Sequence, residues 1–319
     1  RDNRGKLVRW LKSVEEDFQV FDTENPACSV ESVPVSVNDR TRFIYEAACC
    51  GLRDFFVKNG YKKACVGVSG GIDSAVVACL AVAALGAENV RGLMMPSQFS
   101  SEGSVEDAKQ LAENLGIEFH VVPITEAYRS IVDTLIPVIG GTDFDATEEN
   151  IQSRIRTLML MALQNKNGYV LLNCSNKSEN ALGICTLYGD TGGAFSVTGD
   201  LYKTEMYDLA RYINRKFGAP IPENILTKEP SSELRPNQKD SDMLPSYEVV
   251  DAILYRLIED GQSREEIINA GFDSDEVQKI YAMVMRNEKK RFQYPPVLRL
   301  SSSSFGHEYR MPLTHKYVK

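Results

Sequence analysis

The residue types best suited to chemistry stand together in residues 69–74, which read SGGIDS. The two glycines carry no Cβ and can adopt positive φ, so successive backbone N–H groups can point into one concavity and bind phosphate. Ser69 and Ser74 add hydroxyl donors. Asp73 would repel a polyphosphate unless a divalent cation lay between the two. The stretch therefore indicates a Mg²⁺-nucleotide site.

This stretch must be held by the elements on either side of it. Residues 64–68 are apolar and rich in β-branched side chains, which is typical of a buried strand. Residues 75–85 are alanine-rich and free of proline, and Gly86 follows them in the usual position for a helix end. The order strand, glycine turn, helix places the turn at a helix N-terminus, where the partial positive charge favours phosphate.

The pattern differs from the Walker A loop, GxxxxGK[ST], because it lacks the lysine. It resembles the SGGxDS pyrophosphate loop of the N-type ATP pyrophosphatase superfamily. Members of that superfamily adenylate an acceptor oxygen and release pyrophosphate, after which a nucleophile displaces AMP. The resemblance implies ATP as a co-substrate and Mg²⁺ as a cofactor.

The composition sets limits on partners and location. The chain has 319 residues, of which 43% are hydrophobic, with a net charge of −8 and a pI of about 5.2. Because it has no extended run of lysine or arginine, we expect no nucleic-acid partner. It has no run of 18 apolar residues and no signal peptide, so we expect no membrane partner. The seven cysteines include no CxxC pair and no zinc spacing, which favours a reducing cytoplasm.

Strand and helix patterns alternate along most of the chain. Further strands are predicted at 90–95, 117–124 and 169–174, and helices at 41–60, 101–115 and 147–161. This alternation predicts an α/β fold, a doubly wound, Rossmann-like parallel sheet with ligands at the carboxyl ends of its strands. Residues 219–245 hold five prolines and predict a lid or a disordered loop. C-terminal helices are predicted at 247–259, 264–270 and 275–291.

Four polar positions outside the glycine turn are candidates by pattern alone. Asn150 and Arg154 stand four apart on a predicted helix, where they could address one ligand or simply face solvent. Glu179 follows a predicted strand, so it could be a second Mg²⁺ ligand or an ordinary acid in the first turn of a helix. Lys203 opens another helix, where plain solvent exposure is the alternative. The pattern leaves these alternatives open.

Several segments together resemble the NAD⁺ synthetase family, and more closely the synthetase half of its bacterial glutamine-dependent members. The match implies one synthetase domain of the adenine nucleotide alpha hydrolase type at 41–319, preceded by a linker or docking arm at 1–40. The segments that carry the resemblance are GVSGGIDS (67–74), MPSQFSSEG (95–103), TEENIQSRIR (147–156), NKSE (176–179), TLYGDTGG (186–193), KT (203–204), SSELRP (231–236) and the tail at 295–312.

The resemblance implies an amide ligation. The nicotinate carboxylate of deamido-NAD⁺ attacks the α-phosphate of ATP, pyrophosphate leaves, and ammonia displaces AMP from the acyl-adenylate to give NAD⁺. In the glutamine-dependent members, a nitrilase-like glutaminase domain with a Glu-Lys-Cys catalytic set supplies the ammonia. This chain has no room for that domain, and it begins at Arg1, so we interpret it as a fragment or a processed chain. The family also implies a homodimer.

The resemblance further implies roles for individual residues. Asp73 and Glu179 match the Mg²⁺ ligands and, with Lys203, form the implied catalytic set. Cys174 stands where the family more often has a threonine that contacts ATP, and a thiol is a poorer hydrogen-bond partner. The implied deamido-NAD⁺ contacts, partly across a dimer interface, are Asn150, Arg154, Glu179 and Lys290. The implied ATP contacts are Gly67, Val68, Ser69, Gly70, Gly71, Ile72, Asp73, Ser74, Cys174, Lys203 and Ser231.

Two other functions compete with this one. The first is another amide-forming or thiolating pyrophosphate-loop enzyme, although the acidic charge disfavours the tRNA-modifying relatives. The second is a non-catalytic adenine-nucleotide-binding module. The second loses weight because Asp73, Glu179 and Lys203 are all present.

Overall fold

The computed structural model describes residues 11–20, 40–140 and 144–316. Residues 11–20 form no helix or strand, and the first helix begins at Arg40. The predicted linker or docking arm at 1–40 therefore falls mostly outside the described residues. Where the chain is described, no helix is both long enough and apolar enough to cross a membrane.

A parallel sheet lies at the centre of the fold. Its order is β3-β2-β1-β4-β5, and all neighbouring strands run parallel. The strand order reverses between β1 and β4, which makes the carboxyl end of β1 a topological switch point, where α/β sheets bind ligands. The doubly wound α/β prediction is confirmed. The strands are β1 (Lys63–Gly67), β2 (Val90–Met94), β3 (Glu118–Val121), β4 (Tyr169–Asn173) and β5 (Phe195–Ser196).

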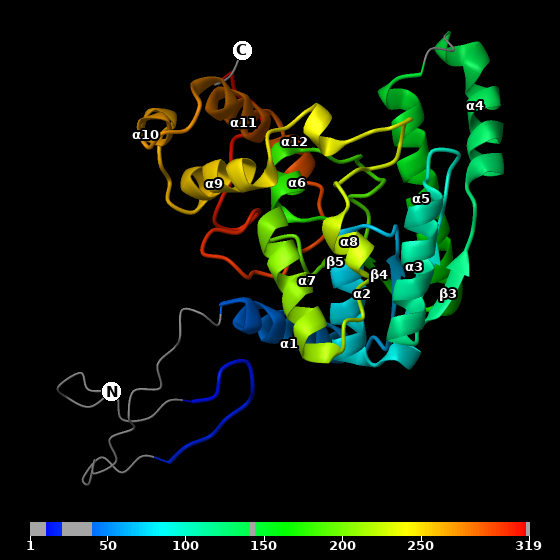
Figure 1. Cartoon of the computed structure of the whole chain (residues 1–319), viewed down its shortest axis with the longest axis horizontal. Helices are drawn as coiled ribbons and strands as arrows, with labels where there is room; N and C mark the ends of the chain where they lie inside the picture. Colours follow the sequence, from blue (N-terminus) through cyan, green and yellow to red (C-terminus); the bar gives the residue numbers. More distant parts are fainter. Residues whose placement is uncertain (1–10, 21–39, 141–143, 317–319) are drawn as a thin grey trace.

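Helices cover both faces of this sheet (Figure 1). Side chains alternate along β1, so Val66 packs under α2 while Cys65 packs under α5. The helices on the α2 side are α1 (Arg40–Asn59), α2 (Ile72–Leu85), α3 (Glu102–Leu115), α7 (Lys203–Phe217) and α8 (Glu223–Thr227). Those on the other side are α4 (Thr125–Ile139) and α5 (Ala146–Asn167).

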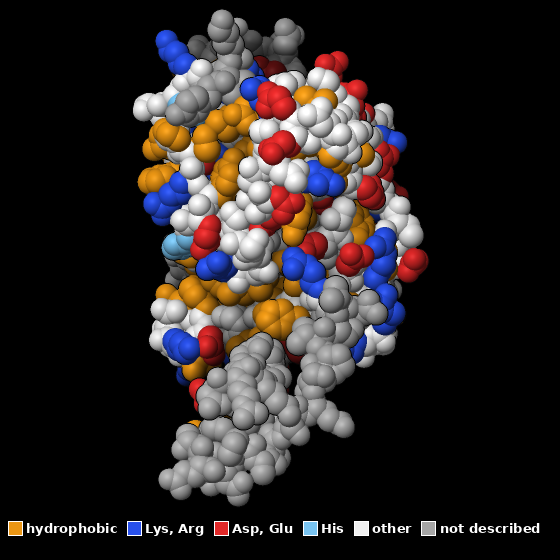
Figure 2. Space-filling model, turned by 90° about the vertical axis from the view of Figure 1, so that its left-hand side faces the viewer, with side chains coloured by type: hydrophobic (Ala, Val, Ile, Leu, Met, Phe, Trp, Pro, Cys, Tyr) orange, Lys and Arg blue, Asp and Glu red, His pale blue; other side chains and the backbone are white. Residues whose placement is uncertain are grey.

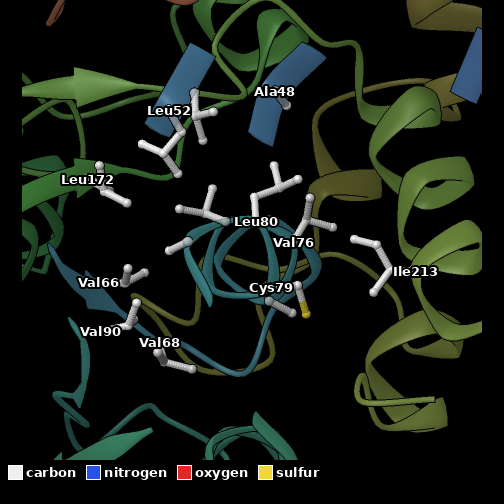
Figure 3. Close-up of a cluster of buried hydrophobic side chains, with 14 of the residues drawn as sticks. Ala48, Leu52, Val66, Val68, Val76, Cys79, Leu80, Val90, Leu172 and Ile213 are labelled. Carbon is white, nitrogen blue, oxygen red and sulfur yellow. The ribbon is translucent and has the colours of Figure 1, made fainter. Parts of the chain in front are cut away.

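Helix α2 is the most enclosed element, and every residue from 74 to 81 is buried. Figure 3 shows Leu80 pointing toward Ala48 and Leu52, while Val76 points toward Ile213. The many alanines of α2 leave room for α1, α7 and the sheet to approach from all sides, which explains why this helix is apolar around its whole circumference. The N-terminus of α2, and the glycine turn before it, are therefore fixed by packing.

A second apolar core gathers the C-terminal helices. The predicted helix at 275–291 is interrupted at Asn287, whose side chain donates to the carbonyl oxygens of Leu182 (2.8 Å) and Met283 (2.8 Å). The elements that line this core or adjoin it are α6 (Lys177–Leu182), α9 (Tyr247–Ile258), α10 (Arg264–Asn269), α11 (Ser274–Arg286) and α12 (Glu288–Arg291).

Two irregular segments complete the fold. The proline-rich stretch predicted as a lid contains α8 and a short 3₁₀ turn, η3 (Asp240–Asp242). The tail continues the sheet, because Val297 pairs in parallel with Ser196. On the face shown in Figure 2, lysine and arginine side chains are separated by acidic and uncharged ones.

Candidate active site

A cavity of about 310 Å³ lies at the carboxyl ends of β1, β2 and β4. Its lining combines the glycine turn, the first residues after β4, the start of α7, one face of α5 and the segment 228–234. The fold thus places the predicted nucleotide loop at the switch point and beside the other strand ends. This cavity is the candidate active site.

The glycine turn has one position that only glycine fits. Gly70 has φ +78°, and a Cβ there would lie 2.2 Å from the backbone oxygen of Ser104. Gly71 is extended with φ −95°, so only the first glycine uses the left-handed region. The Ser74 hydroxyl accepts from the Ser69 N–H (3.1 Å) and donates to the Gly71 carbonyl (3.1 Å). Ser74 therefore shapes the turn.

Asp73, Glu179 and Lys203 meet at the cavity because each lies at the start of a helix. Lys203 Nζ donates to Asp73 Oδ2 (2.5 Å) and to Glu179 Oε1 (3.4 Å). Asn176 donates to Asp73 Oδ1 (3.0 Å), and its own Oδ1 caps α6 by accepting from the Glu179 N–H (2.9 Å). The sequence-predicted catalytic set is thus one hydrogen-bonded cluster.

This cluster carries more negative charge than its lysine balances. Burial, followed by the nearby Asp73 carboxylate, raises the pKa of Glu179 above its usual value. Burial acts to lower the pKa of Lys203, yet Asp73 and Glu179 together hold it well above its usual value. The cavity lining as a whole is acidic, with Asp73, Glu179, Asp190, Glu229, Glu233 and Asp240 against Arg156, Lys203 and Lys228. Such a lining binds a polyanion only together with further cations.

The donor set at this position suits Mg²⁺. Asp73 and Glu179 offer two carboxylates, and no group of three or more His, Cys, Asp and Glu side chains that could hold a metal occurs within the described residues. Mg²⁺ is commonly held by one or two carboxylates, with substrate phosphates and water completing its octahedron. In this structure the Lys203 ammonium contacts both carboxylates.

Two further predicted ATP contacts, Cys174 and Ser231, line the cavity. The Cys174 side chain lines the cavity after β4, and its thiol contacts the Leu172 carbonyl at 4.0 Å. Burial, followed by the nearby Asp73 and Glu179 carboxylates, raises the pKa of this thiol well above its usual value, so Cys174 presents a neutral, weak donor. Ser231 lines the opposite wall, and its hydroxyl accepts from the Glu233 N–H (3.1 Å).

Three of the four residues predicted to contact deamido-NAD⁺ lie outside the cavity lining. Asn150 Oδ1 accepts from the Thr186 hydroxyl (2.6 Å), and Arg154 Nε donates to the Leu187 carbonyl (3.2 Å). Lys290 Nζ donates to the carbonyl oxygens of Gly183 (2.7 Å) and Cys185 (2.9 Å). All three hold the loop that follows α6, whereas Glu179, the fourth, faces the cavity.

Sequence reasoning missed Arg156, which lines the cavity from α5. Its Nε donates to the Met95 carbonyl (3.0 Å), and burial lowers its pKa to about 10. Arg154, two positions earlier, is exposed on another side of the same helix. The RIR pattern and the helical period of 3.6 carried the signal that these two arginines face different surroundings.

Comparison with known proteins agrees with this geometry. The family model described as NAD synthase matches residues 44–294. A glutamine-dependent NAD(+) synthetase of Aquifex aeolicus is 52% identical over 276 residues, which is 86% of this chain and 48% of that protein. The chain spans about half the length of the curated relatives that it matches.

Two solved structures resemble this one. The glutamine-dependent NAD⁺ synthetase of Acinetobacter baumannii, in complex with ADP, aligns with TM-score 0.62 and 40% identity over 92% of this chain and 53% of that chain. The NH3-dependent NAD synthetase of Campylobacter jejuni, in complex with nitrate, aligns with TM-score 0.62 and 30% identity over 78% of this chain and 95% of that chain. Since the family model covers most of the chain and includes the glycine turn, Glu179 and Lys203, the chain belongs to the NAD synthase family.

Proposed function

We propose that the chain catalyses the ATP-dependent amidation of deamido-NAD⁺ to NAD⁺ through an acyl-adenylate, with release of AMP and pyrophosphate. The observation that carries this proposal is the cluster of Asp73, Glu179 and Lys203 beside a glycine turn at the switch point of the sheet. With Mg²⁺ held by the two carboxylates, such a cluster would stabilise the negative charge that develops when pyrophosphate leaves an α-phosphate.

Each part of the cavity has a proposed task. The backbone N–H groups of the glycine turn bind the phosphates of ATP at the N-terminus of α2. Asp73 and Glu179 hold Mg²⁺, which when bound neutralises the phosphate charge that these carboxylates would otherwise repel. Lys203 donates to a phosphate oxygen as pyrophosphate departs, and Ser231 contacts ATP from the opposite wall. Cys174 contributes packing more than hydrogen bonding.

The acceptor is proposed to bind beside the cavity, at the loop held by Asn150, Arg154 and Lys290. Glu179 faces the cavity and lies in the first turn of the helix that leads into this loop, so it can address both substrates. On the outer side of α5, Leu158 is 65% exposed and Met161 is 44% exposed. We propose that a second copy of the chain covers this apolar face and completes the acceptor site.

The nitrogen source is proposed to be ammonia. The attack on an acyl-adenylate needs neutral NH₃, and the alignment with 95% of an NH3-dependent enzyme supports a synthetase of this size that uses it. The glutamine-dependent relatives are about twice as long, so we propose that a glutaminase domain delivers ammonia in the full-length enzyme. We place the reaction in the cytoplasm, where the free thiols of the described cysteines would stay reduced.

The test is an assay of NAD⁺ formation with ATP, Mg²⁺ and deamido-NAD⁺, supplied in turn with ammonium and with glutamine. We expect product with ammonium, at a rate that climbs with pH as NH₃ becomes available, and none with glutamine freed of contaminating ammonia. Nicotinate mononucleotide and xanthosine monophosphate serve as control acceptors, measured through acceptor-dependent pyrophosphate release. Turnover of another acceptor in preference to deamido-NAD⁺ would favour another pyrophosphate-loop enzyme. ATP binding without turnover of any acceptor would favour a binding module.

A further inference from the structure

The segment 228–234 forms one wall of the cavity, and a small set of polar contacts ties it to the N-terminus of α3. Glu233 Oε1 accepts from the hydroxyls of Ser101 (2.8 Å) and Ser104 (2.7 Å), and its Oε2 accepts from the Ser101 N–H (3.2 Å). Lys228 Nζ donates to the Ser104 hydroxyl (3.1 Å) and to Asp107 (2.9 Å). These five side chains are called the clasp below.

The backbone at Glu233 is strained. Its φ is +48°, in the left-handed region that favours glycine and that a side chain with a Cβ adopts at a cost. A residue with a Cβ keeps this left-handed backbone conformation only when the surrounding contacts stabilise it. The three hydrogen bonds to one carboxylate, at a helix N-terminus, are the contacts that do so.

Ser104 connects the clasp to the glycine turn. It is 3% exposed, and its hydroxyl contacts both Glu233 and Lys228. Its backbone oxygen is the atom that a Cβ on Gly70 would strike, so the turn and the start of α3 are in direct contact. One buried serine therefore touches both the wall that closes the cavity and the loop that is proposed to bind phosphate.

We propose that Glu233 is a positioning residue whose carboxylate fastens the 228–234 wall to α3 and so sets how long a nucleotide stays in the cavity. The role of Glu233 in nucleotide dissociation is independent of the proposed function; only its expected effect on the KM for ATP rests on that function. Glu233 carries Ser231 with it, because the Glu233 N–H donates to the Ser231 hydroxyl (3.1 Å). The contacts that fasten the 228–234 wall to α3 therefore also position Ser231, the proposed ATP contact.

The first experiment measures dissociation of a fluorescent N-methylanthraniloyl ATP from the full chain by stopped flow. We expect Glu233→Gln and Ser104→Ala each to speed dissociation about tenfold, because each removes hydrogen bonds to a charged group. The KM for ATP should rise by the same factor, with kcat changed less than twofold. The double variant should speed dissociation by less than the product of the two single effects, because both variants weaken the Ser104–Glu233 contact.

The matched control is Asp242→Asn, an exposed acid near the same wall that lies outside the cavity lining. It should dissociate at the wild-type rate, and all variants should keep the wild-type melting temperature within a few degrees. Wild-type dissociation in both Glu233→Gln and Ser104→Ala would overturn the proposal. Nucleotide dissociation does not require amidation, so wild-type dissociation rates in these variants would not contradict the proposed function. Conversely, the dissociation rates can still be measured if the chain makes no NAD⁺.

The second experiment separates the carboxylate from the strain. Glu233→Ala keeps the costly left-handed backbone without the contacts that hold it, whereas Glu233→Gly removes the contacts and the cost together. We expect Glu233→Ala to release nucleotide several-fold faster than Glu233→Gly. Equal rates for these two variants would show that the wall is not held against backbone strain.

Discussion

In the part of the chain that the structure describes, two lysines are buried between pairs of carboxylates, Lys203 and Lys177, and they differ in what else surrounds them. Lys203 contacts Asp73 and Glu179 at the cavity, where these carboxylates are 18% and 23% exposed. Lys177, in the same NKSE segment as Glu179, contacts Asp200 and Glu259, which are 0% and 2% exposed.

The charged groups around Lys177 have many hydrogen-bond partners. Its ammonium also donates to the Ser301 hydroxyl (2.7 Å) and the Ser303 carbonyl (2.9 Å), and it lies over the rings of Tyr202 (5.1 Å) and Phe305 (5.9 Å). Although burial acts to raise the pKa of Glu259, hydrogen bonds from Lys177 and Ser302 hold it below its usual value.

The pKa of Glu179 moves the other way, because burial, followed by the nearby Asp73 carboxylate, outweighs the effect of Lys203. We therefore expect the Lys177 cluster, whose carboxylates accept further hydrogen bonds and are buried, to serve stability, and the Lys203 cluster, which faces the cavity, to serve catalysis. The following predictions test this difference.

The largest effect should come from the cavity. Asp73→Asn and Glu179→Gln should each lower kcat more than about 10³-fold, because each removes a proposed Mg²⁺ ligand and charge balance for the leaving pyrophosphate. The double variant should lose little more than either single one. NAD⁺ formation is to be measured across a Mg²⁺ titration, and wild-type rates in either variant would show that these carboxylates do not hold the metal.

Lys177→Met should act on stability. It leaves Asp200 and Glu259 buried without their cation, which should lower the free energy of unfolding by about 3 kcal/mol. Lys203→Met is the matched variant, and it should cost less stability but far more turnover, because Asp73 and Glu179 can reach water. Urea unfolding and NAD⁺ formation measured on both variants give the comparison. Equal stability losses would mean that the two clusters are alike.

The pH dependence of stability should show the contribution of Glu259. The pKa of Glu259 is lowered on folding, so its ionised form stabilises the protein above the usual glutamate pKa, and this contribution is lost as the pH falls through the lowered pKa. The wild type should therefore lose its stability advantage over Glu259→Gln as the pH falls below about 4.5. Melting temperatures from pH 6 to 3.5 test this, and a constant difference would contradict it.

Cys174→Thr should have the smallest effect. The hydroxyl adds a stronger donor at the cavity wall in nearly the same volume, which should lower the KM for ATP by about threefold. Cys79→Thr is the control, because its buried thiol packs in the α2 core away from the cavity. An unchanged KM in Cys174→Thr would mean that the side chain at this position does not reach ATP.

The sequence predicted the α/β fold, because its strands are short apolar runs between long periodic helices. The resemblance to the NAD⁺ synthetase family implied that Asp73, Glu179 and Lys203 act together, whereas the local pattern left solvent exposure open for Lys203; in the structure the three side chains form one cluster. Elements such as β5 and α8 were missed, because two and five residues are too short to show a period.

The distinction between the two lysines could not be predicted. Lys177 stands two positions from Glu179 in the same NKSE segment, and the local sequence does not show that its side chain points away from the cavity. Its partners Asp200 and Glu259 lie far along the chain, in segments whose packing depends on the second core. Likewise, the clasp joins α3 to the 228–234 wall, which lies more than a hundred residues further along the chain. A local sequence pattern cannot predict such a contact.

The tail that continues the sheet beyond β5 has a consequence for synthesis of the protein. Ser196 leaves the ribosome about a hundred residues before Val297, its partner. Until residues 300–303 arrive, Asp200 lacks the N–H groups of Leu300 and Ser301, and Lys177 lacks its serine contacts. A nascent chain interrupted before this point would carry unsatisfied charges beside an open sheet edge, a state that chaperones and proteases recognise. The pairing of Val297 and the contacts of residues 300–303 can therefore form only after the rest of the sheet has been made.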